Sequence, residues 1–114
     1  MPAFCPTRIV IHPDVRRTYE EVESRARQGR KLESALWKSF QHALGRLRED
    51  GQWGEVIPSI PRYFTEAYEV PNLYCIDLAF FHRAFYTIFA RDIVLLDLVD
   101  HERHDQLFGR RGRR

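Results

Sequence analysis

Three side chains in the second half of the chain carry groups that can bind an anion and move protons. Arg83 begins a run rich in β-forming residues, and its planar guanidinium can hold two oxygens of a phosphate. His101 and His104 follow the last such run, and an imidazole has an ordinary pKa of about 6.5, which suits proton transfer at neutral pH. Together these residue types could supply a fixed cation beside groups that titrate near neutral pH, which is a combination suited to acid–base chemistry on a phosphate.

The same residues also have structural explanations. Arg83 could form a salt bridge at the end of its strand, with Asp97 or Asp100 as its partner. His101 could fix the C-terminal turn through a hydrogen bond. The sequence leaves both explanations open.

A metal site is a rival use of the same region. Histidine and carboxylate donors gather there, at His82, Asp100, His101 and His104. None of their spacings matches a recognised zinc motif. We therefore expect no metal and no cofactor.

The elements that position Arg83 form a strand-rich second half. Three runs dense in β-forming residues are separated by segments short enough to be hairpin turns, Phe80–His82 and Arg91–Asp92. The pattern predicts an antiparallel meander with strands at Asn72–Ala79, Arg83–Ala90 and Ile93–Val99.

The first half predicts a strand followed by two helices. Thr7–His12 is β-branched, and Pro13 suits the start of a helix that Gly29 ends. A second apolar stripe runs over Leu32–Leu47 and stops at Gly51. Because the connection between the two helices is short, they must run antiparallel as a helical hairpin.

Between the hairpin and the meander, Gln52–Pro71 is broken by glycine and prolines. We expect an ordered loop there with at most one helical turn, packed down by its aromatic residues. His101–Phe108 is expected to form a final short turn or helix. The predicted fold is therefore α+β: an N-terminal strand, an antiparallel helical hairpin, and a three-stranded antiparallel meander in one small twisted sheet.

Both faces of the middle strand of the meander carry apolar residues. Arg83 and Phe85 face one way, and Ala84 and Tyr86 face the other. One face must cover the helical hairpin. The other face is covered by the loop and the tail, or is offered to a partner.

Length and composition bound the class of protein. The chain has 114 residues, of which 44% are hydrophobic and 30% charged, so we expect one globular domain over 1–114 with a basic tail at 109–114. We see no membrane span and no secretory signal. Cys5 and Cys75 are read as free thiols of a reducing, cytoplasmic compartment.

The basic residues of the chain are almost all arginines, and several of them lie in the tail. Lysine and arginine number 18 against 16 acidic residues, and all but Lys31 and Lys38 of the basic residues are arginine. The basic tail ends the chain with Arg110, Arg111, Arg113 and Arg114. Such a tail is most often a solvated end, and it could also contact nucleic-acid phosphates.

Several short motifs, in their order, give the chain a family resemblance. They are Ile57-Pro58, Tyr68-Glu69-Val70-Pro71-Asn72-Leu73, Leu78, Arg83-Ala84-Phe85-Tyr86-Thr87-Ile88, Asp100-His101-Glu102-Arg103-His104-Asp105 and Phe108-Gly109. With the predicted element order, this series resembles the RelE/ParE superfamily of bacterial and archaeal toxins over roughly residues 8–109.

The resemblance implies the toxin of a type II toxin–antitoxin pair, a metal-independent endoribonuclease that cleaves mRNA on the ribosome. It also implies a cognate antitoxin as protein partner, with mRNA and the ribosome as further partners, and homodimerisation is left open. In such enzymes the 2′-hydroxyl attacks the adjacent phosphate while cations stabilise the transition state and other groups transfer the protons.

Carried over by position, the resemblance assigns catalytic roles to Arg83, His101 and His104. Arg83 matches the strand arginine that contacts the scissile phosphate, and His101 matches a histidine just after the final strand. His104 stands where the family pattern has a tyrosine. Histidine can replace tyrosine as an acid or base, but a missing tyrosine also fits a member without catalysis.

Substrate contacts are expected from Arg62, Arg103, Phe108 and Arg110.

Two alternatives to the nuclease remain. One is a non-catalytic ParE-type toxin that binds a protein target such as DNA gyrase. The other is a degenerate toxin fold that serves only protein association through its apolar sheet face.

Overall fold

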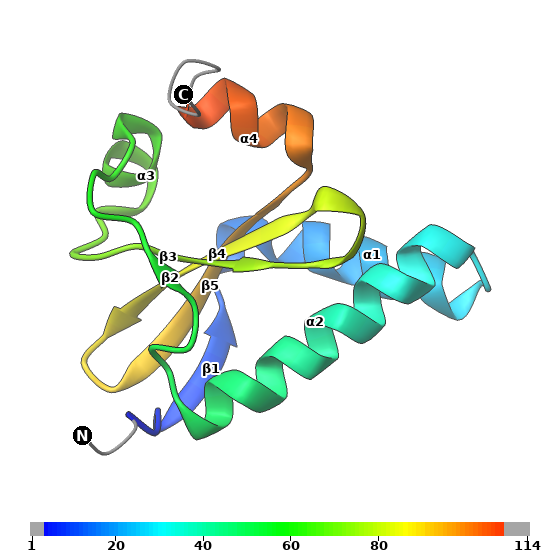
Figure 1. Ribbon diagram of the computed structural model, residues 1–114, viewed down its shortest axis with the longest axis horizontal. Coiled ribbons are helices and arrows are strands. Elements are labelled where there is room, and N and C mark those ends of the chain that lie inside the picture. Colours follow the sequence, from blue (N-terminus) through cyan, green and yellow to red (C-terminus); the bar gives the residue numbers. More distant parts are fainter. Residues whose placement is uncertain (1–3, 109–114) are drawn as a thin grey trace.

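A computed structural model describes residues 4–108, except for the side chain of His101. Its centre is a five-stranded sheet in the order β1-β5-β4-β3-β2 (Figure 1). The strands are β1 Arg8–Ile11, β2 Glu55–Val56, β3 Tyr74–Asp77, β4 Arg83–Phe89 and β5 Asp92–Val99. β1 runs parallel to β5, and the other neighbours are antiparallel, so the predicted meander is confirmed.

Helices cover both faces of this sheet, which makes the fold α+β as expected (Figure 1). They are the short 3-10 helices η1 Pro13–Val15 and η2 Ala79–Phe81, and the α-helices α1 Arg16–Arg27, α2 Lys31–Glu49, α3 Arg62–Tyr68 and α4 His101–Phe108. The hairpin of α1 and α2 packs on one face, and α3 and α4 pack on the other. No helix within residues 4–108 is long and apolar enough to cross a membrane.

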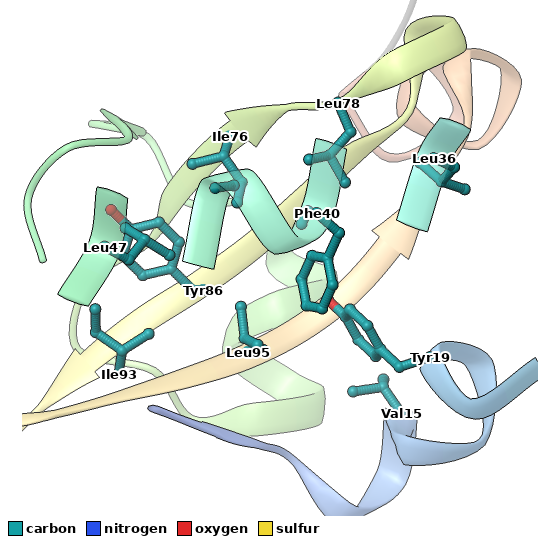
Figure 2. Close-up of a cluster of buried hydrophobic side chains, with 12 residues drawn as sticks. Val15, Tyr19, Leu36, Phe40, Leu47, Ile76, Leu78, Tyr86, Ile93 and Leu95 are labelled. Carbon is teal, nitrogen blue, oxygen red and sulfur yellow. The ribbon is translucent and has the colours of Figure 1, made fainter. Parts of the chain in front are cut away.

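The larger core lies between the helical hairpin and the sheet, where Figure 2 shows its side chains meeting. Tyr19 of α1 stacks near Phe40 of α2, with ring centroids 5.1 Å apart. Tyr86 of β4 is fully buried, and its hydroxyl donates to the carbonyl of Gly51 at 2.7 Å. That bond fixes the chain just after α2 against the middle of the sheet.

The segment predicted as a loop is the main correction to the sequence-based fold. Gln52–Pro71 contains β2 and the seven-residue helix α3, which exceeds the single helical turn that we expected. Pro61 is the N-cap residue of α3, and the seven residues after it contain no proline or glycine. The prolines therefore bound a helix instead of excluding one. Phe64 of α3 is fully buried, so the expected packing of this segment is confirmed.

The first strand of the meander is shorter than predicted because a side chain replaces its backbone. The sequence predicts that the strand begins at Asn72, but β3 begins only at Tyr74. The Asn72 amide donates to the carbonyl of Ile88 at 2.9 Å and accepts from the Ile88 N–H at 2.8 Å. This side chain thus makes the two hydrogen bonds that a strand residue would otherwise form with β4.

A β-bulge interrupts the pairing of β4 with β5. Ala84 pairs with Leu98 and Tyr86 with Leu95, so Leu96 and Asp97 both lie opposite Phe85. Strict alternation would turn Asp97 toward the apolar face under the helical hairpin. The extra residue turns it to the opposite face instead, where it accepts a hydrogen bond from Tyr68.

Candidate functional site

The candidate site is built around Arg83, at the first position of β4. Its direct cross-strand neighbour on β3 is Asp77. Arg83 Nε lies 3.0 Å from Asp77 Oδ1, and the two side chains are 39% and 78% exposed. The salt-bridge explanation for Arg83 thus holds, but with a different partner from the two expected. Because the pair is open to solvent, it adds little to stability and an incoming anion can compete for the guanidinium.

The two partners that the sequence suggested for Arg83 are engaged elsewhere. Asp97 Oδ1 accepts the hydroxyl of Tyr68 at 3.0 Å. Asp100 Oδ1 accepts the backbone N–H of Arg103 at 2.9 Å, and its carbonyl accepts the N–H of His104 at the same distance. Asp100 is therefore the N-cap of α4, and it fixes the direction in which this helix leaves β5.

This capped helix brings His104 to Arg83. Arg83 Nη1 lies 3.2 Å from His104 Nε2, although the residues are 21 positions apart in sequence. A guanidinium can only donate, so the imidazole nitrogen must accept. In this arrangement the ring carries a proton on Nδ1, which lies 3.9 Å from Asp105 Oδ1.

Aromatic packing holds the His104 ring in place. It stacks on Phe108 with centroids 4.5 Å apart, and Phe108 in turn stacks on Phe85 of β4 at 5.5 Å. Only 17% of the His104 side chain is exposed. The pair therefore combines a half-exposed cation with a largely buried, oriented base.

The other predicted site residues do not all join this pair. Phe108 packs into the smaller core, which lies between the sheet and the helices α3 and α4, instead of facing outward. It therefore positions His104. Arg62 opens α3 and pairs with Glu66, with its side chain 85% exposed. For His101 the structure gives only the backbone position, as the first residue of α4, and Arg110 lies outside the described residues.

Arg103 belongs to a second cluster that the sequence analysis missed. Its guanidinium lies 5.3 Å from the ring centroid of Tyr63 on α3, and the Tyr63 and Tyr68 rings lie 6.1 Å apart. Burial, and to a smaller extent a hydrogen bond to Asp97, raises the pKa of Tyr63. Burial also raises the pKa of Tyr68. Both phenols therefore stay protonated at neutral pH. One signal was present in the sequence, since Asp97 is a charged residue between Leu96 and Leu98 in a β-run.

The two thiols and the residues considered as possible metal donors were located in the structure. Cys5 is exposed and Cys75 buried, and neither forms a disulfide. Burial raises the pKa of Cys75 to about 12, against a smaller opposing effect of Arg83. Among the residues whose side chains are described, no three histidine, cysteine or acidic side chains are grouped to hold a metal ion.

The chain was also compared with protein-family models, curated proteins and solved structures, and none of the three comparisons gives a match.

Proposed function

We propose that the chain is a cytoplasmic RelE/ParE-type toxin of a type II toxin–antitoxin pair that cleaves mRNA on the ribosome without a metal. The order of elements supports the family assignment. The first strand lies parallel to the last strand of the meander, and the helical hairpin between them covers one face. The strand, the hairpin and the three-stranded meander follow the chain order that the resemblance implies, and β2 is an additional strand.

The contact between Arg83 and His104 is the observation that carries the proposed activity. It joins a permanent cation to an imidazole at 3.2 Å, on two elements that are far apart in sequence. In RNA cleavage by the 2′-hydroxyl, negative charge builds up on the non-bridging phosphate oxygens while protons move at the entering and leaving oxygens. The pair offers a group for the phosphate charge, Arg83, and a group for the proton at the entering oxygen, His104.

Substrate binding would also release the base. In the free protein the Nε2 lone pair of His104 accepts a hydrogen bond from Arg83. A phosphate that binds the guanidinium bidentately competes with Asp77 and His104 for its N–H groups. His104 Nε2 can then accept the proton of the 2′-hydroxyl.

The remaining steps follow from the balance of atoms. The 2′-oxygen forms a bond to phosphorus, and the bond from phosphorus to the 5′-oxygen breaks. Arg83 stabilises the charge on the pentacoordinate phosphate, and we assign His101 to protonate the leaving 5′-oxygen. Arg62, Arg103 and Arg110 would hold flanking phosphates. The products are a 2′,3′-cyclic phosphate and a 5′-hydroxyl.

The chemistry of the RNA ends tests this proposal. After induction in growing cells, new mRNA ends should carry a 5′-hydroxyl and accept a label from polynucleotide kinase without prior phosphatase treatment. New ends that carry a 5′-phosphate would contradict it, since a water nucleophile assisted by a metal leaves that group.

A non-catalytic toxin that binds a protein target remains the second candidate, and one observation favours it. A mostly apolar hollow of about 190 Å³ lies on the sheet beside α3, with a lining that includes Val70, Phe89 and Val94. Phe89 is 65% exposed, and an apolar ring at that level of exposure suits a protein contact. Growth inhibition without new RNA ends would select this candidate.

A further inference from the structure

The turn between β3 and β4 exposes two neighbouring aromatic rings. Phe80 and Phe81 are 55% and 80% exposed. Both have left-handed backbones, with φ values of 57° and 61°. This conformation is unfavourable for bulky residues, and strain of this kind persists where the surrounding structure imposes it. Two apolar rings held in this way at the surface offer flat area to a ligand.

The turn is anchored on both sides. The N–H of Leu78 donates to the carbonyl of His82 at 2.8 Å, which closes the turn. The N–H of Ala79 donates to Ser39 Oγ at 3.1 Å, which ties the turn to α2. In Figure 1 the turn projects at the end of the sheet near the start of α4. The two phenylalanines are therefore presented by a fixed backbone.

These rings line a hollow of about 470 Å³ that also contains polar groups. Its lining consists of Asp77, Leu78, Phe80, Phe81, His82 and Arg83. It thus combines flat apolar surface, a carboxylate acceptor, an imidazole and the guanidinium of the candidate site. An apolar peptide would use only the first of these and would desolvate the others. A nucleotide can use all of them.

We propose that this hollow binds an unpaired nucleobase of single-stranded RNA, stacked on Phe80 or Phe81 while Arg83 holds an adjacent phosphate. Amino and imino groups on the edge of the base would donate to Asp77 or His82. Proteins that bind single-stranded RNA commonly combine aromatic stacking with a cation on the backbone. The inference deepens the proposed function, on which it rests, by naming where the substrate's base binds.

Binding without cleavage is the appropriate test. The probe is a fluorescein-labelled ten-nucleotide RNA of mixed sequence with 2′-O-methyl groups throughout, which cannot undergo 2′-hydroxyl attack. A second probe of the same length carries abasic residues at every internal position. Fluorescence anisotropy measures the affinity of the full chain for both probes.

Leucine substitutions remove the stacking surface and keep an apolar side chain. The double variant F80L/F81L should bind the base-containing RNA at least fivefold more weakly, since stacking is worth about 1–3 kcal/mol per base. Its affinity for the abasic probe should equal that of the wild type. F80Y/F81Y keeps two flat rings and should bind like the wild type. Phe89→Leu is the matched control, because that phenylalanine is also exposed but lines the hollow beside α3.

The outcomes separate this inference from the proposed function. Unchanged affinity of F80L/F81L, equal losses on both probes, or no measurable binding by the wild type would each overturn the inference. If the wild type still produces 5′-hydroxyl ends in cells, the nuclease proposal survives that result. If the phenylalanines matter for binding but no cleavage occurs, the inference stands and the nuclease proposal fails.

Discussion

Tyr19 donates its hydroxyl hydrogen bond to the backbone carbonyl of Leu96, 2.7 Å away, and so joins α1 to the bulge in β5. A bulge disrupts the ladder locally, and a buried carbonyl left without a partner would be unfavourable. The Tyr19 side chain supplies that partner at 1% exposure. The bulge, which turns Asp97 toward α3, is thus supported from the opposite face of the sheet.

Removing the Tyr19 hydroxyl should therefore destabilise the fold. Tyr19→Phe keeps the ring but leaves the Leu96 carbonyl without its donor, and we expect the free energy of unfolding to fall by about 1–3 kcal/mol. Urea denaturation followed by circular dichroism measures this. Tyr74→Phe is the control, because this half-buried ring also packs on the sheet, stacked on Tyr86 with centroids 5.1 Å apart, and lies on β3, away from the bulge in β5. Equal stability of the two variants would show that the bond does not matter.

The cap of α4 should control the order of the helix that carries His104. Asp100→Ala removes the acceptor for the Arg103 N–H, and loss of such a cap costs about 0.5–2 kcal/mol. We expect faster hydrogen exchange at the Arg103 amide, measured by NMR. Asp100→Asn keeps an oxygen acceptor and should exchange like the wild type. Identical exchange in Asp100→Ala and the wild type would contradict the assigned cap.

The two thiols should differ strongly in reactivity. A maleimide reacts with the thiolate, and Cys75 is buried with a pKa of about 12, so at pH 8 only about one molecule in ten thousand carries that anion. Mass spectrometry should find one rapid label, on the exposed Cys5. Because the pKa is raised, labelling of native Cys75 should stay slow at pH 8 and accelerate as the pH rises toward 12. Rapid double labelling at pH 8 would show that Cys75 is accessible.

A short acidic antitoxin is the partner that the proposed function requires. Co-expressed with the product of the neighbouring reading frame, the chain should elute as a complex in size-exclusion chromatography. Opposite charge should contribute to this affinity, so salt near 1 M should weaken it. Two independent peaks at micromolar concentration in low salt would argue against the pairing.

Much of the fold could be predicted because its signals are local. The apolar stripes of the helical hairpin and the β-branched runs of the meander each depend on a few neighbouring residues. The sequence does not predict helix α3, because Pro58, Pro61 and Pro71 indicate breaks throughout the segment. Strand β2 spans only Glu55–Val56, which is too short to produce a periodic pattern.

The site was predictable in its residue types but not in its contacts. The resemblance brought Arg83 and His104 together, and they do touch. Asp77 pairs with Arg83 because of the register of the β3–β4 hairpin. The turn of this hairpin has two residues with left-handed backbones, Phe80 and Phe81, and phenylalanine does not suggest that conformation. That Asp97 bonds to Tyr68 depends on the bulge, and no local pattern announces the added residue.

The account depends most on Arg83, and one experiment tests it directly. Arg83→Ala removes the proposed stabilising cation, which typically lowers the rate by about two to three orders of magnitude. Arg8→Ala is the matched control, because Arg8 also joins its Nε to a carboxylate, Asp92, at 2.9 Å on the same sheet. Thermal stability should be nearly unchanged in both, since one partner in each ion pair is mostly exposed to solvent.

The measurement is primer extension on translated mRNA after induction of the wild type, Arg83→Ala and Arg8→Ala. We predict discrete stops at the same positions for the wild type and Arg8→Ala, and none for Arg83→Ala at equal protein levels. Identical stops in the wild type and Arg83→Ala, or no stops in the wild type, would contradict the proposed nuclease.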